Sequence, residues 1–150
     1  MTRLHETVVT ALPVDAAFPF IADFANNPIW DPGTAAARRI DDGPVGVGST
    51  YELDIRMGGR TVPMTYRITA YEPNQRVELE GVGATVRARD DIRFSATPDG
   101  GTHVDYVADI ELTGWMRLLT PFAQGALRRI GEQARDGMQR ALDARVGART

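Results

Sequence analysis

The segment "STYELDIRMGGRTVPMTYRITAY", residues 49–71, alternates apolar and polar side chains on both sides of a pair of glycines. Because successive side chains of a strand point to opposite faces, each half predicts a strand with one apolar face. Gly58 and Gly59 fit a two-residue hairpin loop. Pro63 belongs to the polar phase and has no N–H to donate, so it predicts an edge or a bulge. The apolar positions are Tyr51, Leu53, Ile55, Met57, Val62, Met64, Tyr66 and Ile68.

The same alternation continues toward the C-terminus. Residues 76–82 and 83–97 each predict a strand, and "PDGG" at 98–101 is a strong turn signal. Residues 102–114 predict the next strand, with an apolar phase that includes Tyr106. Five strands joined by short loops indicate an antiparallel meander that is apolar on one face.

Before this run, "LHETVVTAL" (4–12) predicts a strand and "AAARRIDDG" (35–43) predicts a weaker one. Between them, "VDAAFPFIADF" predicts a short helix with Asp15 as its N-cap and Pro19 in its first turn. The following "NNPIWDPG" ends this helix, because proline restricts the residue before it.

Residues 115–146 carry apolar residues at steps of three and four, which predicts a long helix. Pro121 should kink this helix or mark a broken first turn. A helix of about 30 residues spans roughly 45 Å, enough to cover the apolar face of the sheet. A single helix cannot fill the trough of a strongly bent sheet, so we expect a cavity between the two, which is the usual shape of a small-molecule site.

Length and composition point to one domain, residues 1–150 with a core at about 4–146, of ordinary apolar (43%) and charged (25%) content. The net charge of -3 carries no basic excess, so nucleic acid is not an expected partner. No apolar run approaches the roughly 20 residues of a membrane span, and "MTRLHETVV" lacks the apolar core of a signal peptide. We expect a cytoplasmic protein, monomeric or weakly homodimeric.

Missing residue types exclude several chemistries. The chain has no cysteine, which excludes disulfides and thiolate nucleophiles, and no lysine, which excludes Schiff-base chemistry and a P-loop. All 17 basic residues are arginine, as expected of a GC-rich bacterial genome. His5 and His103 have no metal-ligand spacing around them. We therefore expect neither a metal nor an organic cofactor.

Taken in order, "VDAAFPFIADFANNPIWDP", "GPVGVGSTYEL", "YRITAYEPNQRVELEG", "PDGGTHVDYVADIELTGW" and the amphipathic C-terminal segment resemble the polyketide cyclase/dehydrase branch of the START-like (SRPBCC) superfamily. The resemblance covers residues 4–146. It implies an α+β helix-grip fold, in which a seven-stranded antiparallel sheet wraps around a long C-terminal helix and two short helices follow the first strand. It also implies a hydrophobic cavity between sheet and helix.

Trp30 lies in the segment that the resemblance places at the cavity mouth, where it either contacts a ligand or plugs the loop against the sheet. Tyrosines on the apolar phase are either core residues or pocket residues. The full set of candidate ligand-binding residues is Trp30, Tyr51, Leu53, Met64, Tyr66, Asp90, Tyr106, Leu119 and Phe122.

Asp90 is the candidate catalytic residue, because it shares the apolar phase of Ile92 and Phe94. A buried carboxylate has a raised pKa, which suits a general acid or base. If Asp90 faces inward, Tyr66 and Tyr106 are its expected hydrogen-bond partners. The alternative is a bulge, a register slip or a strand end that leaves Asp90 in water.

Three functions remain open at this point. The first is a carrier of a lipid-like, aromatic or polyketide-like molecule, which requires a mainly apolar cavity of about 300 Å³ or more. The second is a cofactor-independent cyclase or dehydratase that uses Asp90. The third is a protein-interaction module, with a small cavity and an exposed apolar patch elsewhere.

Overall fold

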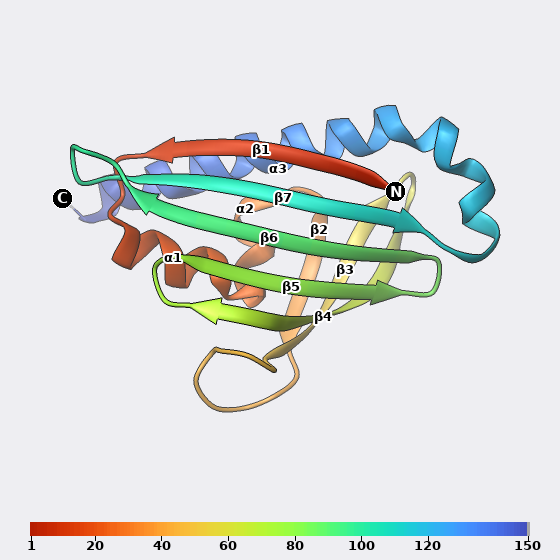
Figure 1. Cartoon of the computed structure of the whole chain (residues 1–150), viewed down its shortest axis with the longest axis horizontal. Coiled ribbons are helices and arrows are strands. Elements are labelled where there is room, and N and C mark those ends of the chain that lie inside the picture. Colours follow the sequence, from red (N-terminus) through yellow and green to blue (C-terminus); the bar gives the residue numbers. More distant parts are fainter. Residues whose placement is uncertain (150) are drawn as a thin grey trace.

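Seven antiparallel strands form one sheet in the order β1-β7-β6-β5-β4-β3-β2 in the computed structural model, which describes residues 1–149 (Figure 1). Consecutive strands from β2 to β7 are neighbours, and β1 closes the order by pairing with β7. This is the predicted seven-stranded antiparallel sheet. The strands are β1 (Thr2–Thr10), β2 (Thr34–Arg39), β3 (Thr50–Met57), β4 (Arg60–Glu72), β5 (Arg76–Gly83), β6 (Val86–Ala96) and β7 (Thr102–Leu112).

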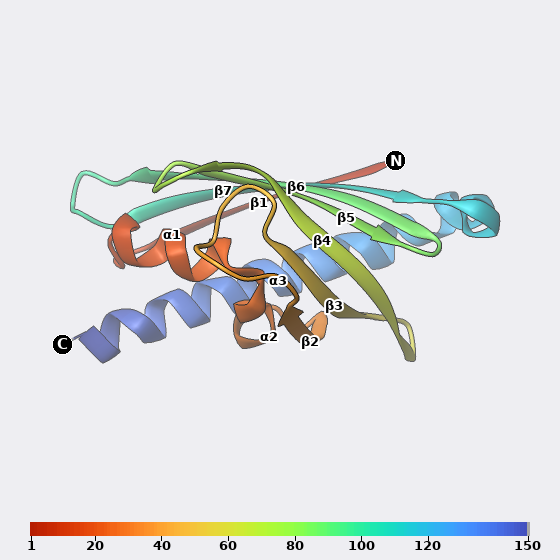
Figure 2. The same cartoon turned by 90° about the horizontal axis from the view of Figure 1, so that it is seen from below.

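All helices lie on one side of this sheet, and β2, β3 and β4 bend toward them (Figure 2). The long C-terminal helix crosses the concave face, as the helix-grip fold requires, and packs closely along β1. The helical segments are α1 (Val14–Ala22), η1 (Phe24–Asn26), α2 (Asn27–Trp30), η2 (Gly114–Leu119) and α3 (Thr120–Arg149), of which η1 and η2 are 3-10 helices.

The prolines explain where these helices start and end. Pro121 is the second residue of α3, where a missing N–H costs little, and the preceding turns are 3-10. The predicted broken first turn is therefore confirmed. Two predictions for the first helix are wrong: Pro13 rather than Asp15 occupies the N-cap, and Pro19 lies inside α1. The helix begins earlier than predicted because Pro13 itself supplies the extended N-cap residue.

Pro63 pairs with Asp54 of β3, whereas the pairing of β4 with β5 starts one residue later, at Met64. Pro63 thus has a ladder partner on one side only, as an edge position requires.

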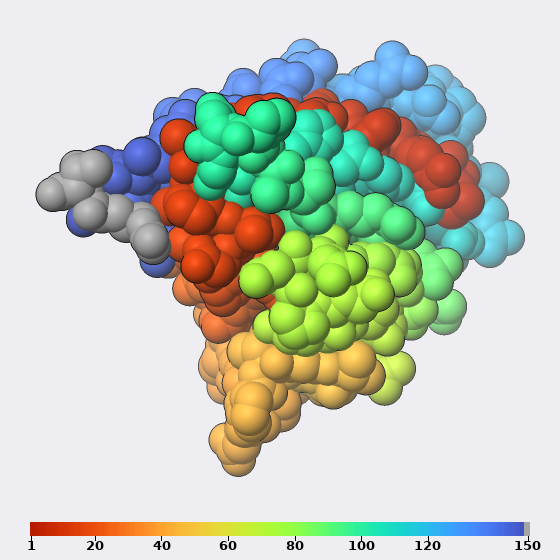
Figure 3. Space-filling model, turned by 60° about the vertical axis from the view of Figure 1, so that its left-hand side comes forward, coloured from red at the N-terminus to blue at the C-terminus, as the bar shows by residue number. Residues whose placement is uncertain are grey.

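The glycine-rich connection between β2 and β3, residues 40–49, is a loop that projects from one end of the molecule (Figure 3, orange-yellow). Arg39 holds it, because its guanidinium donates to the carbonyl oxygen of Gly43 at 2.7 Å and to the Asp41 carboxylate at 3.0 Å. Asp41 in turn accepts from the backbone N–H of Thr50 at 2.9 Å. The loop is thus fixed at both ends by hydrogen bonds.

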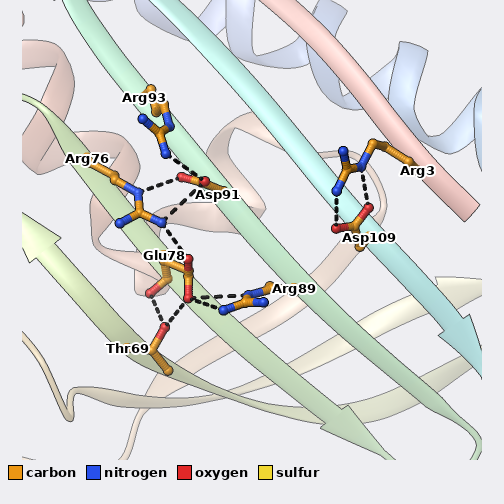
Figure 4. Close-up of polar contacts among 8 residues, drawn as sticks. All are labelled: Arg3, Thr69, Arg76, Glu78, Arg89, Asp91, Arg93 and Asp109. Carbon is orange, nitrogen blue, oxygen red and sulfur yellow. Dashed lines mark hydrogen bonds and ion pairs between the residues drawn. The ribbon is translucent and has the colours of Figure 1, made fainter. Parts of the chain in front are cut away.

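Charged pairs cover the outer face of the sheet (Figure 4). Arg76 of β5 contacts Glu78 at 2.6 Å and Asp91 of β6 at 3.0 Å, while Arg89 contacts Glu78 at 3.0 Å. Because side chains alternate along β6, the outward positions of Arg89 and Asp91 turn Asp90 toward α3. The expected inward phase of Asp90 is confirmed, without a bulge or a register slip at this position.

One glycine permits the closest approach between helices. A Cβ atom at Gly137 of α3 would lie 2.0 Å from the carbonyl oxygen of Trp30, so only glycine lets α2 pack this closely against α3. This contact sets the position of Trp30 relative to α3.

Candidate functional site

A cavity of about 130 Å³ lies between the concave face of the sheet and α3. Its wall is mostly apolar, with side chains from β1, β3, β4, β6 and β7 on one side and from α3 on the other. Among the predicted site residues, those that line it are Trp30, Met64, Tyr66, Asp90 and Tyr106.

Asp90 and Tyr106 form a hydrogen-bonded pair in the cavity wall. They come from adjacent strands, and Asp90 lies opposite Ala108, two residues from Tyr106, so both side chains are on the same face. The Tyr106 hydroxyl donates to Asp90 Oδ2. The predicted hydrogen bond between Asp90 and Tyr106 is therefore present, whereas none joins Asp90 to Tyr66 within residues 1–149.

The electrostatic environment of Asp90 suits proton transfer near neutral pH. Burial raises the pKa of Asp90 from an ordinary 3.8 to about 7, against the lowering effect of the hydrogen bond from Tyr106. The charges of Asp31 and Asp109 raise it further. Both protonation states of Asp90 are consequently populated around pH 7.

Asp31 also lines the cavity and was missed by sequence reasoning. It follows α2 directly, and its carboxylate accepts from the Gly33 N–H at 2.8 Å and the Thr34 hydroxyl at 3.0 Å. Burial raises the pKa of Asp31 above its ordinary value, despite these two hydrogen bonds. The available signal was its position right after Trp30, in the segment already assigned to the cavity mouth.

Tyr66 lies flat against the backbone of β5, because a Cβ atom at Gly81 would come within 2.6 Å of its ring. Burial first, and then the charge of Asp90, raise the pKa of the Tyr66 hydroxyl well above its ordinary value. Burial and Asp90 do the same for the pKa of Tyr106. Both phenols are therefore neutral at physiological pH and can donate hydrogen bonds.

Trp30 combines the two roles weighed for it. It is only 2% exposed and packs against Tyr106, with ring centroids 6.2 Å apart at 61°, as a plug would. It also lines the cavity, and its buried indole N–H has no hydrogen-bond partner within residues 1–149. The ring thus closes the cavity and forms part of its wall.

Four predicted site residues lie away from the cavity. Tyr51 and Leu53 are buried in the core, and Tyr51 packs against the ring of Phe24, 6.3 Å between centroids. Leu119 and Phe122 are exposed, because η2 and the first turn of α3 precede the part of the helix that faces the cavity. The cavity-lining residues of α3 are Leu127, Ile130, Gly131, Ala134, Arg135 and Met138.

Arg135 of α3 lines the cavity together with Glu6 of β1. Their charged groups are 3.6 Å apart, and the side chains are 41% and 21% exposed. Since both side chains reach solvent, this pair lies where the wall of the cavity meets the surface of the protein.

The cavity is smaller than the 300 Å³ or more expected of a carrier. Large side chains occupy the trough, notably Trp30, Tyr66, Tyr106 and Met138. In addition, α3 approaches β1 closely, since a Cβ atom at Gly131 would lie 3.3 Å from Leu4. The volume of 300 Å³ is the one that a carrier would require, and the side chains that fill the trough leave less than that.

No helix in residues 1–149 is long and apolar enough to span a membrane. A family model described as "Polyketide cyclase / dehydrase and lipid transport" matches residues 1–143. The search of curated proteins found no match.

Solved structures of the same fold include an aromatase/cyclase called Zhui from a Streptomyces species, with a TM-score of 0.78 and 16% identity over 99% of this chain and 94% of that one. A START superfamily protein from Mycobacterium smegmatis has a TM-score of 0.73 and 16% identity over 99% of both chains. A protein from Thermus thermophilus has a TM-score of 0.79 and 14% identity over 95% of this chain and 98% of that one. At these identities the similarity concerns the fold.

Proposed function

Since this chain belongs to the polyketide cyclase/dehydrase and lipid transport family, we propose that it binds a small, largely hydrophobic molecule in the cavity between the sheet and α3. The observation that supports this proposal is an apolar cavity whose wall carries the Asp90–Tyr106 pair. A few placed polar groups in an apolar pocket are typical of small-molecule sites.

The volume of the cavity limits the ligand. A dry apolar cavity of about 150 Å³ accepts benzene, and the cavity here has about 130 Å³. A single six-membered ring or a short aliphatic segment therefore fits. A longer ligand would have to extend past Glu6 and Arg135 or displace α3.

The polar groups define the chemistry that the ligand should carry. Tyr66 and protonated Asp90 can donate hydrogen bonds, so a carbonyl or hydroxyl oxygen on the ring or chain is favoured. We therefore propose a monocyclic or short-chain ligand with at least one such oxygen.

Fluorescence of Trp30 tests the proposal directly. Trp115→Phe leaves Trp30 as the one tryptophan of the chain, and the variant would be titrated with single-ring phenols and ketones, fatty acids and fused three-ring aromatics. Single-ring compounds should give a saturable change. No saturable change with any compound, in a protein shown to be folded, would overturn the proposal.

Two matched substitutions on β6 serve as controls. Ala88→Leu adds bulk inside the cavity and should abolish binding, because Ala88 lines the wall. Ala96→Leu adds the same bulk on the exposed end of the same strand and should leave binding unchanged. Equal loss in both variants would indicate a general effect on folding.

A second candidate function is cofactor-independent cyclisation or dehydration, and the pKa of Asp90 near 7 favours it. The Asp90 carboxylate would remove a proton from the carbon next to a ligand carbonyl. The neutral Tyr66 phenol would donate a hydrogen bond to the enolate oxygen that forms. Asp90 would then return the proton during ring closure or loss of water.

Hydrogen–deuterium exchange at the α-carbon of a bound ketone separates the two functions. An enzyme should catalyse this exchange, and Asp90→Asn should abolish it while sparing ligand affinity. A carrier should bind the ketone without catalysed exchange, in both wild type and variant.

A further inference from the structure

The start of the C-terminal helical region carries an exposed group of large apolar side chains, which we call the apolar patch. Trp115, Leu118 and Phe122 are 69%, 80% and 84% exposed, and Leu119 is 40% exposed. Single exposed apolar residues are normal on protein surfaces, whereas four within eight positions mark an interaction site. The segment lies where η2 turns into α3, at the end of the molecule opposite the C-terminus (Figure 1).

Within the segment that carries the apolar patch all charged residues have one sign, and Glu111 and Glu132 lie just outside it. Between residues 112 and 131 the chain has three arginines, Arg117, Arg128 and Arg129, and no acidic residue, although the whole chain carries a net charge of -3. The three arginines are exposed, and none forms an ion pair within residues 1–149. On the outer face of the sheet, by contrast, Arg76, Arg89 and Arg93 are paired with carboxylates.

From this arrangement we propose that the apolar patch docks on the surface of a membrane that contains anionic lipids. Tryptophan, phenylalanine and leucine beside unpaired arginines are typical of helices that lie in the membrane interface. The apolar side chains would enter the headgroup region, while the arginines would contact lipid phosphates.

A second copy of the chain fits the apolar patch less well. In a two-fold dimer the same surface meets itself, so the positively charged segment of one copy would face that of the other. Like charges placed opposite each other oppose association. An anionic surface instead complements them.

The location of the apolar patch relates docking to the cavity. On α3, Phe122 precedes Leu127 and Ile130, which line the cavity, by one to two turns. A hydrophobic molecule leaving the lipid phase would therefore have a short path along α3. This path rests on the proposed ligand-binding function, whereas docking itself does not.

Vesicle flotation tests docking without any ligand, so its outcome is independent of the cavity. The full chain would be mixed with vesicles of phosphatidylcholine alone, or of phosphatidylcholine with roughly one-third phosphatidylglycerol. Wild type should float with the anionic vesicles, and Trp115 emission should shift to the blue. Binding should fall by about tenfold or more in Leu118→Ser/Phe122→Ser, because both side chains leave the interface.

Val47→Ser is the matched control, since Val47 is 70% exposed in the loop far from α3 and its loss should change nothing. Arg128→Gln/Arg129→Gln should weaken binding to anionic vesicles and reduce its salt dependence. Absence of vesicle binding, or equal binding by wild type and Leu118→Ser/Phe122→Ser, would overturn the proposal. A dimer that Leu118→Ser/Phe122→Ser dissociates, without vesicle binding, would overturn it in favour of a second copy.

Discussion

At the scale of single residues, Asp90 is where the stability of the fold conflicts with the proposed proton-transfer role. A carboxylate that is 6% exposed on an apolar face is unfavourable when charged, and one hydrogen bond from Tyr106 offsets only part of that cost. An asparagine or a leucine would suit this position better for stability alone. An aspartate here is what the proposed proton-transfer role requires.

We expect Asp90→Asn to change how stability depends on pH. Between pH 4 and 7 the folded protein retains the Asp90 proton that the unfolded chain has released, so raising the pH through this window destabilises the wild type. A pKa raised from 3.8 to about 7 corresponds to about 4 kcal/mol. The asparagine side chain does not titrate. The free energy of unfolding of the variant should therefore rise relative to that of the wild type between pH 4 and pH 8.

Urea unfolding of both proteins at several pH values from 4 to 8 measures this difference. Titrating groups that do not interact with Asp90 are common to both chains and cancel in the comparison. If the free energies of unfolding of wild type and variant changed with pH in the same way, the pKa of Asp90 would not be raised in the folded protein, which would contradict the prediction.

Replacing Tyr106 by phenylalanine should raise the pKa of Asp90 further. The hydrogen bond from Tyr106 is the one interaction that lowers this pKa, because it favours the charged carboxylate. Carbon NMR titration of the Asp90 carboxyl group would report the change. Tyr71→Phe, whose ring contacts Phe18 instead, is the matched control and should leave the Asp90 titration in place.

At the scale of elements, the contact between α2 and α3 positions the site, because it holds both Trp30 and Asp31. Gly137→Ala should destabilise the fold by about 1–3 kcal/mol, since its Cβ would meet a backbone oxygen that cannot yield without moving α2. Gly125→Ala on the same helix has nothing within 4 Å and should stabilise by up to about 1 kcal/mol. Thermal or urea unfolding measures both, and equal effects would contradict the close contact.

The outer face of the sheet allows a second test at this scale, which compares a charge cluster around Glu78 with a pair whose arginine is exposed. Glu78 is 8% exposed and accepts hydrogen bonds from Thr69, Arg76 and Arg89 (Figure 4). Glu78→Ala should cost about 2–3 kcal/mol, because several donors lose their acceptor together. Asp109→Ala loses only the pair with the exposed Arg3 and should cost clearly less. Urea unfolding measures the loss of stability in each variant, and an equal or larger loss in Asp109→Ala would contradict the prediction.

At the scale of the whole molecule, the volume left between sheet and α3 selects the ligand by size. A bound single-ring ligand at about 100 times its Kd should add about 2.7 kcal/mol to the free energy of unfolding. A fused three-ring ligand should add nothing while α3 stays in place. Thermal unfolding with each ligand tests this, and a larger effect from the three-ring ligand would show that the helix moves to enlarge the cavity.

The sequence by itself determined the elements and the direction of most side chains. Alternation over residues 50–57, 60–72 and 86–96 is a local property, because side chains of a strand change face at every residue whatever its neighbours are. The inward position of Asp90 followed from this rule, as did its proximity to Tyr106 once two adjacent strands were assigned. The family resemblance supplied the remaining strands and the placement of the helix.

Tertiary structure alone decided what lines the cavity and how large it is. Helical periodicity identified an apolar face that included Leu119 and Phe122. Which part of this face packs against the sheet depends on where β7 ends and on the length of η2. Asp31 belongs to no periodic segment, so its entry into the wall depends on the close packing of α2 at Gly137. The volume of the cavity is the volume of the trough minus the volume of the side chains that fill it. Because these side chains come from several elements, no single segment of sequence predicts the result.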